Sequence, residues 1–552
     1  MTKVDVSSPA TPHVDEASVS LLFPRMPDGR DVGVPACFAD LNLDRVEDWL
    51  AGTRSREAPR YRDMVRQTFR TLVTDPEVIS YRLAVFGDLS DPGLRQVMTE
   101  FNEAMKSVRR LTTGAKKSGD QHVGEGLRMR AISSYVDAVE ACADALDQHR
   151  PESDGLRRVQ DFLSSLRRSE GFERLAADNR SLNDRLQQVH YALRIRGGRV
   201  TVTPERYEGD YSAEVLATFE RFRQVDAEDH LVRTGAGGMG YIEAVILGFV
   251  ARENRELFAE VNAHVRRQER FLHPVVDRLD SELEFLLAYC QLIDQLTAAG
   301  RTFVRPELIA HDDRTQPSVT IEGGVDLALA LKTNHVIPNS VGPAADDLFV
   351  VVSGPNQGGK TTFVRMIGQI CYLAGLGCPV PARLARIRPI DQIYTHFERQ
   401  EDRERETPGG KLEDDLVRIR EILDHATDRS LILINEMFAS TTLADAAYLG
   451  DKILDQLERI GAFTVWVTFV EDLARRSGRT VSMVSQTRKD DPTVRTFEVL
   501  PQAPAGRIYA EAIAALHGLR GEDILQRIAE VPDETPVSPK KSEPGANNGG
   551  GE

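Results

Sequence analysis

The stretch "VVSGPNQGGKTTFVRM", residues 351–366, decides the fold of the second half of the chain. Gly354-x-x-x-x-Gly359-Lys360-Thr361 matches the phosphate-loop pattern without a gap, between an apolar strand-like run and a helix-like pattern. Glycines leave room for backbone N–H groups to turn toward a pyrophosphate, and the start of the helix adds its positive end. The pattern therefore predicts a site for a nucleoside triphosphate.

Two side chains of this loop have separate predicted roles. Lys360 is expected to neutralise the β- and γ-phosphates, and the hydroxyl of Thr361 is expected to ligate Mg²⁺. The residues predicted to bind the nucleotide at the loop are Gly354, Pro355, Asn356, Gln357, Gly358, Gly359, Lys360, Thr361 and Thr362.

A second apolar run, "LILINE" at residues 431–436, ends in an acid. In phosphate-loop enzymes such a strand supplies an acidic pair that supports the metal and polarises the attacking water. Here the pair is Asn435 and Glu436, and Asn435 has lost a charge, so weaker Mg²⁺ binding is expected. Glu436 is the candidate general base and Lys360 the other catalytic candidate; Glu436 as a plain surface acid is the alternative. The predicted metal ligands are Thr361, Asn435 and Glu436.

Short β-branched runs alternate with helical patterns from about residue 319 onward. This alternation is typical of a mainly parallel sheet with helices on its faces. From about residue 43 to residue 300 the pattern is mostly helical instead, which predicts an α + α/β architecture. The expected divisions are a disordered start at 1–18, a helical region at 19–310, the phosphate-loop domain at 311–525 and a disordered tail at 526–552.

The clearest helical pattern lies between Leu257 and Leu296, where apolar residues recur at steps of mostly three or four. It predicts one long helix, or two helices that join near Pro274. Such a helix has the length of a lever or strut, and an ordinary bundle helix is the alternative.

One exception interrupts the helical half, "YALRIRGGRVTVTPERY" at residues 191–207. Two alternating runs flank a Gly-Gly pair, which predicts a tight β-hairpin. Arg194, Arg196 and Arg199 cluster on this hairpin. They are candidates to contact a nucleic-acid backbone as part of a small clamp, and solvated arginines are the alternative.

Composition narrows the function classes. The chain has 552 residues, of which 41% are hydrophobic and 28% are charged, and its net charge is −16. That charge argues against a protein that coats nucleic acid along its whole surface, although it leaves room for a local basic patch. The start lacks the apolar segment of a signal peptide, and no apolar run is long enough to span a bilayer, so a cytoplasmic protein without a membrane partner is expected. The five cysteines have no metal-ligand spacing, which favours buried thiols.

Several segments around the phosphate loop resemble the MutS family. "GPNQGGKTT" resembles that family's phosphate loop, and "HVIPNSV" at 335–341 resembles the segment that holds the adenine. This resemblance makes Val336, Ile337 and Asn339 candidates for the base side of the site. Further segments at 388–402, 421–446 and 506–519 are similar to the family, and the match covers about residues 319–519.

The resemblance implies an ABC-type ATPase that uses ATP and Mg²⁺ and dimerises around two nucleotides. It also implies helical levers that couple the nucleotide state to a DNA clamp, and a partner that is either a second copy or a MutS-like paralogue. Because the helical region starts almost at the first residue, the mismatch-reading domain is expected to be missing, and a mismatch recogniser is not expected.

Three positions depart from the family pattern. The signature serine, which contacts the γ-phosphate of the other subunit, aligns with Gly410, and the next residue, Lys411, is a candidate to replace its contact with positive charge. The acidic metal residue is Asn435, and the switch histidine aligns with Phe469. These departures imply weak ATP hydrolysis, or nucleotide binding that acts as a switch.

The sequence thus favours an ATP-dependent, dimeric, DNA-binding ATPase related to MutS. The alternative is a nucleotide-gated scaffold, or one subunit of a heterodimer, with little or no hydrolysis. A phosphate-loop kinase or other transferase is a third hypothesis, disfavoured because no acceptor-site motif is visible and the long helices would have no role.

Overall fold

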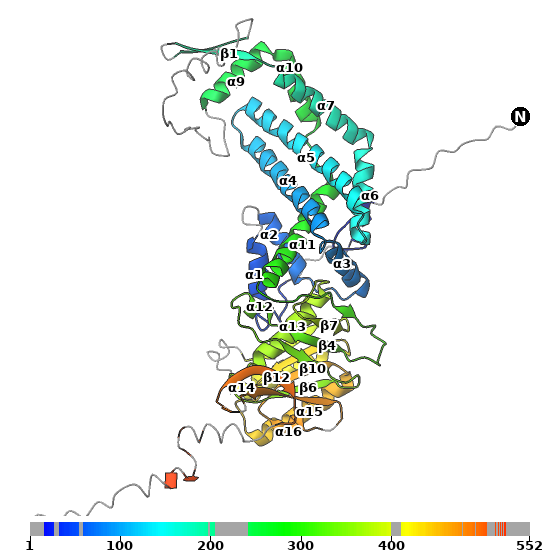
Figure 1. Cartoon of the computed structure of the whole chain (residues 1–552), viewed down its shortest axis with the longest axis vertical. Coiled ribbons are helices and arrows are strands. Elements are labelled where there is room, and N and C mark those ends of the chain that lie inside the picture. Colours follow the sequence, from blue (N-terminus) through cyan, green and yellow to red (C-terminus); the bar gives the residue numbers. More distant parts are fainter. Residues whose placement is uncertain are drawn as a thin grey trace, which may run out of the picture.

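A computed structural model describes residues 16–26, 33–53, 59–196, 199–204, 241–398 and 410–504 except 477, 489 and 492, together with 514, 517, 519, 521, 522, 524 and 525. The described part is elongated, with long helices at one end and the sheet domain at the other (Figure 1). The predicted tail at 526–552, and most of the predicted disordered start and of the closing helix at 506–519, lie outside these residues.

The helical half begins with a short 3-10 helix, η1 (Glu16–Ser18). The prediction that residues 1–18 are disordered is therefore wrong for these last three residues. The physical reason is a long-range contact, because the Arg278 side chain donates hydrogen bonds to the carbonyl oxygens of Glu16 at 3.0 Å and Val19 at 2.7 Å.

Ten α-helices make up the rest of the described helical half. They are α1 (Leu43–Thr53), α2 (Pro59–Arg70), α3 (Pro76–Asp88), α4 (Pro92–Lys117), α5 (Gln121–His149), α6 (Asp154–Arg167), α7 (Glu170–Gln187), α9 (Tyr241–Glu253), α10 (Arg255–Arg267) and α11 (Pro274–Ala298). Local signals start several of them: Asp75, Asp91 and Ser153 accept a hydrogen bond from the first turn of α3, α4 and α6. A proline in the first turn of α3 and α4 adds a favourable backbone angle.

The pattern between Leu257 and Leu296 forms two helices, α10 and α11, which confirms the second of the two predicted forms. The break falls before Pro274, where His273 caps α11 by accepting a hydrogen bond from Val275 N–H. Most of α11 is buried, and it packs against α1, α2 and α4. It is therefore the central helix of the helical half.

The predicted hairpin is confirmed. Strands β1 (Tyr191–Arg196) and β2 (Arg199–Pro204) pair antiparallel, with Arg196 opposite Arg199 and Arg194 opposite Thr201. Arg194 is exposed. The hairpin lies at the end of the helical half that is far from the sheet domain (Figure 1).

The main sheet contains six strands in the order β12-β11-β6-β10-β9-β8. These are β6 (Phe349–Ser353), β8 (Ile393–Phe397), β9 (Leu431–Asn435), β10 (Phe463–Val467), β11 (Thr480–Thr487) and β12 (Arg495–Pro501). Only the β11–β12 pair is antiparallel, so the predicted mainly parallel sheet is confirmed. Helices α13 (Lys360–Gly375), α14 (Gly410–His425), α15 (Leu443–Ile460) and α16 (Glu471–Ala474) accompany it.

A second sheet of four strands was not predicted. It has the order β3-β7-β4-β5 and consists of β3 (Glu307–Leu308), β4 (Val319–Gly324), β5 (Asn339–Val341) and β7 (Leu384–Ile387), with the short helix α12 (Leu327–Ala330) after β4. Strands of two to six residues carry little periodic signal. The partners also lie far apart along the chain, since β4 pairs with β7.

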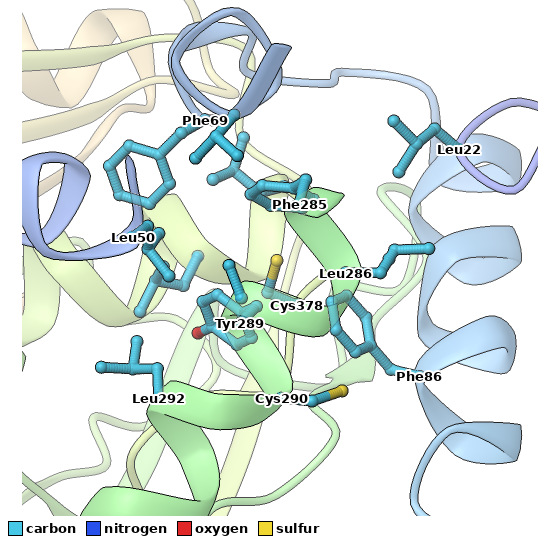
Figure 2. Packing of buried hydrophobic residues seen from close by; sticks show 14 of the residues in the cluster. Leu22, Leu50, Phe69, Phe86, Phe285, Leu286, Tyr289, Cys290, Leu292 and Cys378 are labelled. Atoms are coloured by element: carbon cyan, nitrogen blue, oxygen red, sulfur yellow. The ribbon is translucent and has the colours of Figure 1, made fainter. Parts of the chain in front are cut away.

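One hydrophobic core runs through both halves of the molecule. Figure 2 shows its centre, where Tyr289 of α11 lies among Phe69 of α2, Phe86 of α3 and Cys378, which follows α13. The Tyr289 hydroxyl donates to the carbonyl of Pro379 at 2.7 Å. All five cysteines are buried free thiols, as the sequence predicted. No helix among the described residues has the length and apolarity needed to cross a bilayer.

A buried ionic network joins α11 to the neighbouring helices. Asp280 is fully buried and accepts hydrogen bonds from Tyr61 at 2.8 Å, Asn102 at 3.0 Å and Arg109 at 2.6 Å. Burial raises the pKa of Asp280, so these three donors are needed to keep its carboxylate ionised. The network fixes the register of α11 against α2 and α4.

Replacing Asp280 should therefore destabilise the protein strongly. We expect Asp280→Ala to cost about 3–5 kcal/mol, because it removes one of the two carboxylates that pair with the half-buried Arg109 guanidinium and leaves the Tyr61 and Asn102 donors without this buried acceptor. Asp294→Ala, on the same helix, removes an exposed pair with Arg95 and should cost less than about 1 kcal/mol. Urea unfolding followed by circular dichroism measures both values, and equal costs would contradict the structural role of Asp280.

Candidate functional site

The phosphate-loop segment lies between the central strand β6 and helix α13, as its sequence predicts. Its backbone depends on left-handed angles, with φ of 118° at Gly354, 60° at Gln357 and 91° at Gly359. Gly359 is the N-cap residue of α13 and no side chain there caps the helix. The first backbone N–H groups of α13 are therefore available to an anion.

A neighbouring strand leaves no space beside the loop. A Cβ on Gly358 would lie 2.2 Å from the hydroxyl oxygen of Ser485 on β11, so only glycine fits here. The Ser485 hydroxyl donates a hydrogen bond to the Gly358 carbonyl at 2.6 Å. Sequence reasoning missed Ser485, because nothing local marks its contact with a loop more than a hundred residues away.

Lys360 is folded back onto the loop. Its ammonium donates to the carbonyls of Gly354 at 2.9 Å and Pro355 at 3.1 Å, and it lies 3.8 Å from a carboxylate oxygen of Glu436. Burial lowers the pKa of Lys360, while the Glu436 carboxylate opposes that shift. A buried cation held only by neutral oxygens and a longer ion pair is suited to bind an added anion.

The second predicted motif meets the loop at the end of β9. The Thr361 hydroxyl donates to the amide oxygen of Asn435 at 3.0 Å. Glu436 follows with φ of 57°, an angle that is unusual for a residue with a side chain, and its N–H donates to the Val467 carbonyl at 2.9 Å. Its side chain is 39% exposed and lines the pocket.

These groups share one pocket of about 350 Å³. Its lining residues are Leu329, His335, Val336, Ile337, Asn339, Gln357, Gly359, Lys360, Thr361, Thr362, Glu436 and Phe497. The structure thus brings the predicted base-side residues beside the phosphate loop and Glu436. Gly354, Pro355, Asn356, Gly358 and Asn435 shape the loop or the strand end without lining this pocket.

Sequence reasoning missed Phe497, Leu329 and His335 as lining residues. Phe497 on β12 is 50% exposed and has φ of 62°, so its ring is presented to the pocket from a strained backbone. No sequence signal marks this, because its backbone angle depends on how β12 meets β5.

Asn339 supports the pocket wall and has little free hydrogen-bonding capacity. Its amide oxygen accepts from Val499 N–H at 2.7 Å, and its amide nitrogen donates to the Phe497 carbonyl at 3.0 Å. Arg301, just after α11, fixes the same wall by donating to the carbonyls of Asn334 and Val336. Ile337 is 42% exposed and is the predicted base-side residue most open to a ligand.

The three departures from the family pattern fall at separate places. Gly410 begins α14 with φ of 75°, and the Lys411 ammonium pairs with Glu398 of the same chain. Residues 399–409 lie outside the described part. Phe469 follows β10 and is 46% exposed. Among the described residues no cluster of three or more His, Cys, Asp or Glu side chains could hold a metal by itself.

Comparisons with known proteins agree with this architecture. Residues 350–532 match the family model of MutS domain V. The DNA mismatch repair protein MutS 1 of Halobacterium salinarum is 25% identical over 508 residues, 89% of this chain and 53% of that protein.

Two further relatives cover a smaller share. MutS 2 of Haloarcula marismortui is 24% identical over 424 residues, 71% of this chain and 40% of that protein. MutS of Geobacillus thermodenitrificans is 26% identical over 406 residues, 70% of this chain and 41% of that protein. The chain thus spans about half the length, or less, of these curated relatives. The domain match covers the second half of the chain, and the alignments with these relatives extend into the helical half, so the chain is similar to MutS proteins over most of its length.

Proposed function

We propose that this chain binds ATP with Mg²⁺ in the pocket at the end of β6 and uses the bound nucleotide to control a DNA-binding assembly. The observation that carries this proposal is the meeting of Lys360, Thr361 and Glu436 with the base-side wall in one pocket. A pocket of this size accommodates a nucleotide. Its loop end is polar, which suits the triphosphate, and the wall around Ile337 and Phe497 is apolar, which suits the face of the base.

The phosphate end fits a triphosphate. Backbone N–H groups at the start of α13 supply donors, and Lys360 exchanges its carbonyl partners for phosphate oxygens. Mg²⁺ would be held by the Thr361 hydroxyl and the Asn435 amide oxygen beside the nucleotide's own oxygens, and it would neutralise phosphate charge there. Two protein ligands are enough for Mg²⁺, because this ion keeps several waters and binds largely through phosphate oxygens.

Glu436 is the residue proposed to accept a proton from the attacking water. Its backbone N–H is held by β10 and its carboxylate is exposed to the pocket, as a general base requires. Asn435 removes one negative charge from the metal side, which weakens Mg²⁺ binding. We therefore propose a slow ABC-type ATPase.

The relatives are DNA mismatch repair proteins by name, and this supports DNA as the partner of the assembly. Two copies of the ATPase domain, or one copy and a paralogue, would close around the nucleotides, as the family resemblance implies. The basic hairpin and the sheet domain lie at opposite ends of the described part (Figure 1). The pocket belongs to the sheet domain, so the nucleotide would act on DNA through the helical half.

A nucleotide-gated scaffold with little hydrolysis is the second candidate function. The observation that favours it is the pairing of Lys411 with Glu398 in the same chain. Lys411 already has a partner there, so it is less available to replace the signature contact to another subunit's phosphate. In this form ATP closes the assembly and remains bound.

Nucleotide affinity tests the role of Lys360. Lys360→Ala should weaken ATP binding by about 1.5–3 kcal/mol, or about 10- to 150-fold, because it removes a charge-assisted hydrogen bond. Calorimetric titration of ATP in the presence of Mg²⁺ measures this change. Lys452→Ala, an exposed lysine on α15, is the matched control and should bind ATP like the wild type. Equal affinity of the Lys360 variant and the wild type would refute the site.

Steady-state hydrolysis separates the two candidate functions. If the chain is an ATPase, Glu436→Gln should lower kcat by about a hundredfold and leave ATP affinity nearly unchanged, since only the general base is removed. Glu421→Gln, at an exposed position of α14, should leave kcat unchanged. A wild-type protein that binds ATP but turns over no faster than Glu436→Gln supports the scaffold instead.

The salt dependence of DNA binding tests the role of the hairpin. Changing Arg194, Arg196 and Arg199 together to Ala should weaken DNA binding and flatten its dependence on salt, by about 0.9 in the logarithmic slope for each phosphate that is no longer neutralised. Filter binding with duplex and branched DNA between low and moderate salt measures the slope.

The control for this experiment is a second triple variant. It changes the exposed arginines Arg157, Arg174 and Arg420, which carry the same total charge. Both variants have three fewer positive charges than the wild type, but only the hairpin variant should change the slope. Identical slopes for the two variants would remove the hairpin from the DNA-binding surface.

A further inference from the structure

The turn after β9 holds Glu436 in place through unusual backbone angles. Glu436 has φ of 57° and Phe438 has φ of 68°, so two residues with side chains lie in the left-handed region within three positions. Such angles persist only where surrounding contacts enforce them. The direction of the Glu436 carboxylate therefore depends on whatever holds this turn.

Two neighbouring elements hold it. The Glu436 N–H donates to the Val467 carbonyl at the end of β10, at 2.9 Å. The Phe438 N–H donates to a carboxylate oxygen of Asp415 on α14, at 3.3 Å. Met437 and Phe438 are also buried, in a separate hydrophobic cluster that includes Ile419 of α14 and Trp466 of β10. Asp415 is thus a side chain from another element that fixes the backbone two residues after Glu436.

Asp415 is itself buried against β8. Its side chain is 10% exposed, and its other carboxylate oxygen lies 3.4 Å from Nε2 of His396, which is 2% exposed. Burial lowers the pKa of His396 to about 4, so this imidazole is neutral near pH 7. Neither ring nitrogen of His396 has a hydrogen-bond partner that meets ordinary geometry among the described residues. The neutral imidazole therefore packs against Asp415 without forming a strong hydrogen bond to its second carboxylate oxygen.

Asp415 also lies close to the start of α14. It is five positions after Gly410, about 7.5 Å along the helix axis. Lys411, in the first turn of α14, forms an ion pair with Glu398, which follows β8. Because Gly410 and Asp415 lie on the same rigid helix, a shift of the start of α14 would also move Asp415. That movement would alter the hydrogen bond that Asp415 accepts from the Phe438 N–H.

We infer that Asp415 is a positioning residue for Glu436, and that it couples the placement of α14 to the direction of the Glu436 carboxylate in the nucleotide pocket. This inference rests on the role proposed above for Glu436. Asp415 lies outside the pocket lining and acts only through the turn that it holds.

The test compares four variants and one control variant with the wild type. The four variants are Asp415→Ala, Asp415→Asn, Glu436→Gln and the double variant Asp415→Ala/Glu436→Gln. Asp415→Asn keeps an oxygen that can accept from the Phe438 N–H and should restore most of the function that Asp415→Ala removes. Asp424→Ala, on the same helix but exposed and paired with Arg420, is the control for removal of an acid from α14.

In the ATPase assay, Asp415→Ala should lower kcat at least tenfold and leave KM for ATP within twofold of the wild-type value. The same change should have no further effect in the Glu436→Gln background, because both act through one carboxylate. A KM increase with constant kcat, or the full decrease of kcat in both backgrounds, would overturn the inference.

Hydrogen exchange provides a readout that does not require hydrolysis. Asp415→Ala should accelerate amide exchange in a peptide that covers residues 431–441, while Asp415→Asn and Asp424→Ala should not. Unchanged exchange in Asp415→Ala refutes the inference whatever the ATPase result. Faster exchange in a protein that neither binds nor hydrolyses ATP would instead refute the proposed function and leave the contact of Asp415 with the turn intact.

Discussion

Helix α13 is the element on which the rest of the structure depends. Its first residue, Lys360, belongs to the phosphate loop, and its last turns are held by the helical half. The Tyr372 hydroxyl donates to the Phe69 carbonyl at 2.5 Å, and Gln369 donates to the Leu41 carbonyl at 2.8 Å. The buried Arg82 guanidinium donates to the carbonyl of Leu376, at 3.0 Å. A movement of the phosphate loop would therefore be transmitted to the helical half through α13 and these buried hydrogen bonds.

The pocket concentrates the strained backbone of the molecule. Four of the six non-glycine residues with positive φ in the described part of the chain lie in or next to it: Gln357, Glu436, Phe438 and Phe497. Strain at functional sites is usually kept in place by the surrounding structure. Around Glu436 the neighbours that hold the backbone are β10 and α14, and around Phe497 the contact comes from Asn339 on β5. The geometry of the site thus depends on the relative placement of several elements that are distant along the chain.

Charge distinguishes this site from the MutS pattern that its sequence resembles. Asn435 contributes an oxygen without a negative charge, and Lys411 is paired within its own chain. Lys360 meanwhile stays buried against neutral carbonyls. A triphosphate would add negative charge beside Lys360, whereas a metal ion would find one carboxylate there, that of Glu436. These features favour nucleotide binding together with slow hydrolysis.

The sequence by itself determined the phosphate loop, the parallel strands around it and the hairpin, because each depends on local periodicity or on residues with restricted backbone angles. It left open whether one helix or two would form around Pro274, and the structure has two. The sequence also indicated which residues would meet at the strand ends. Only the tertiary structure decided that Ser485 closes over Gly358, that Phe497 faces the pocket and that Asp415 holds the turn after Glu436. The four-stranded sheet was likewise decided only by the tertiary structure. These contacts join segments that are remote in the chain, and their geometry follows from packing, which no local pattern encodes.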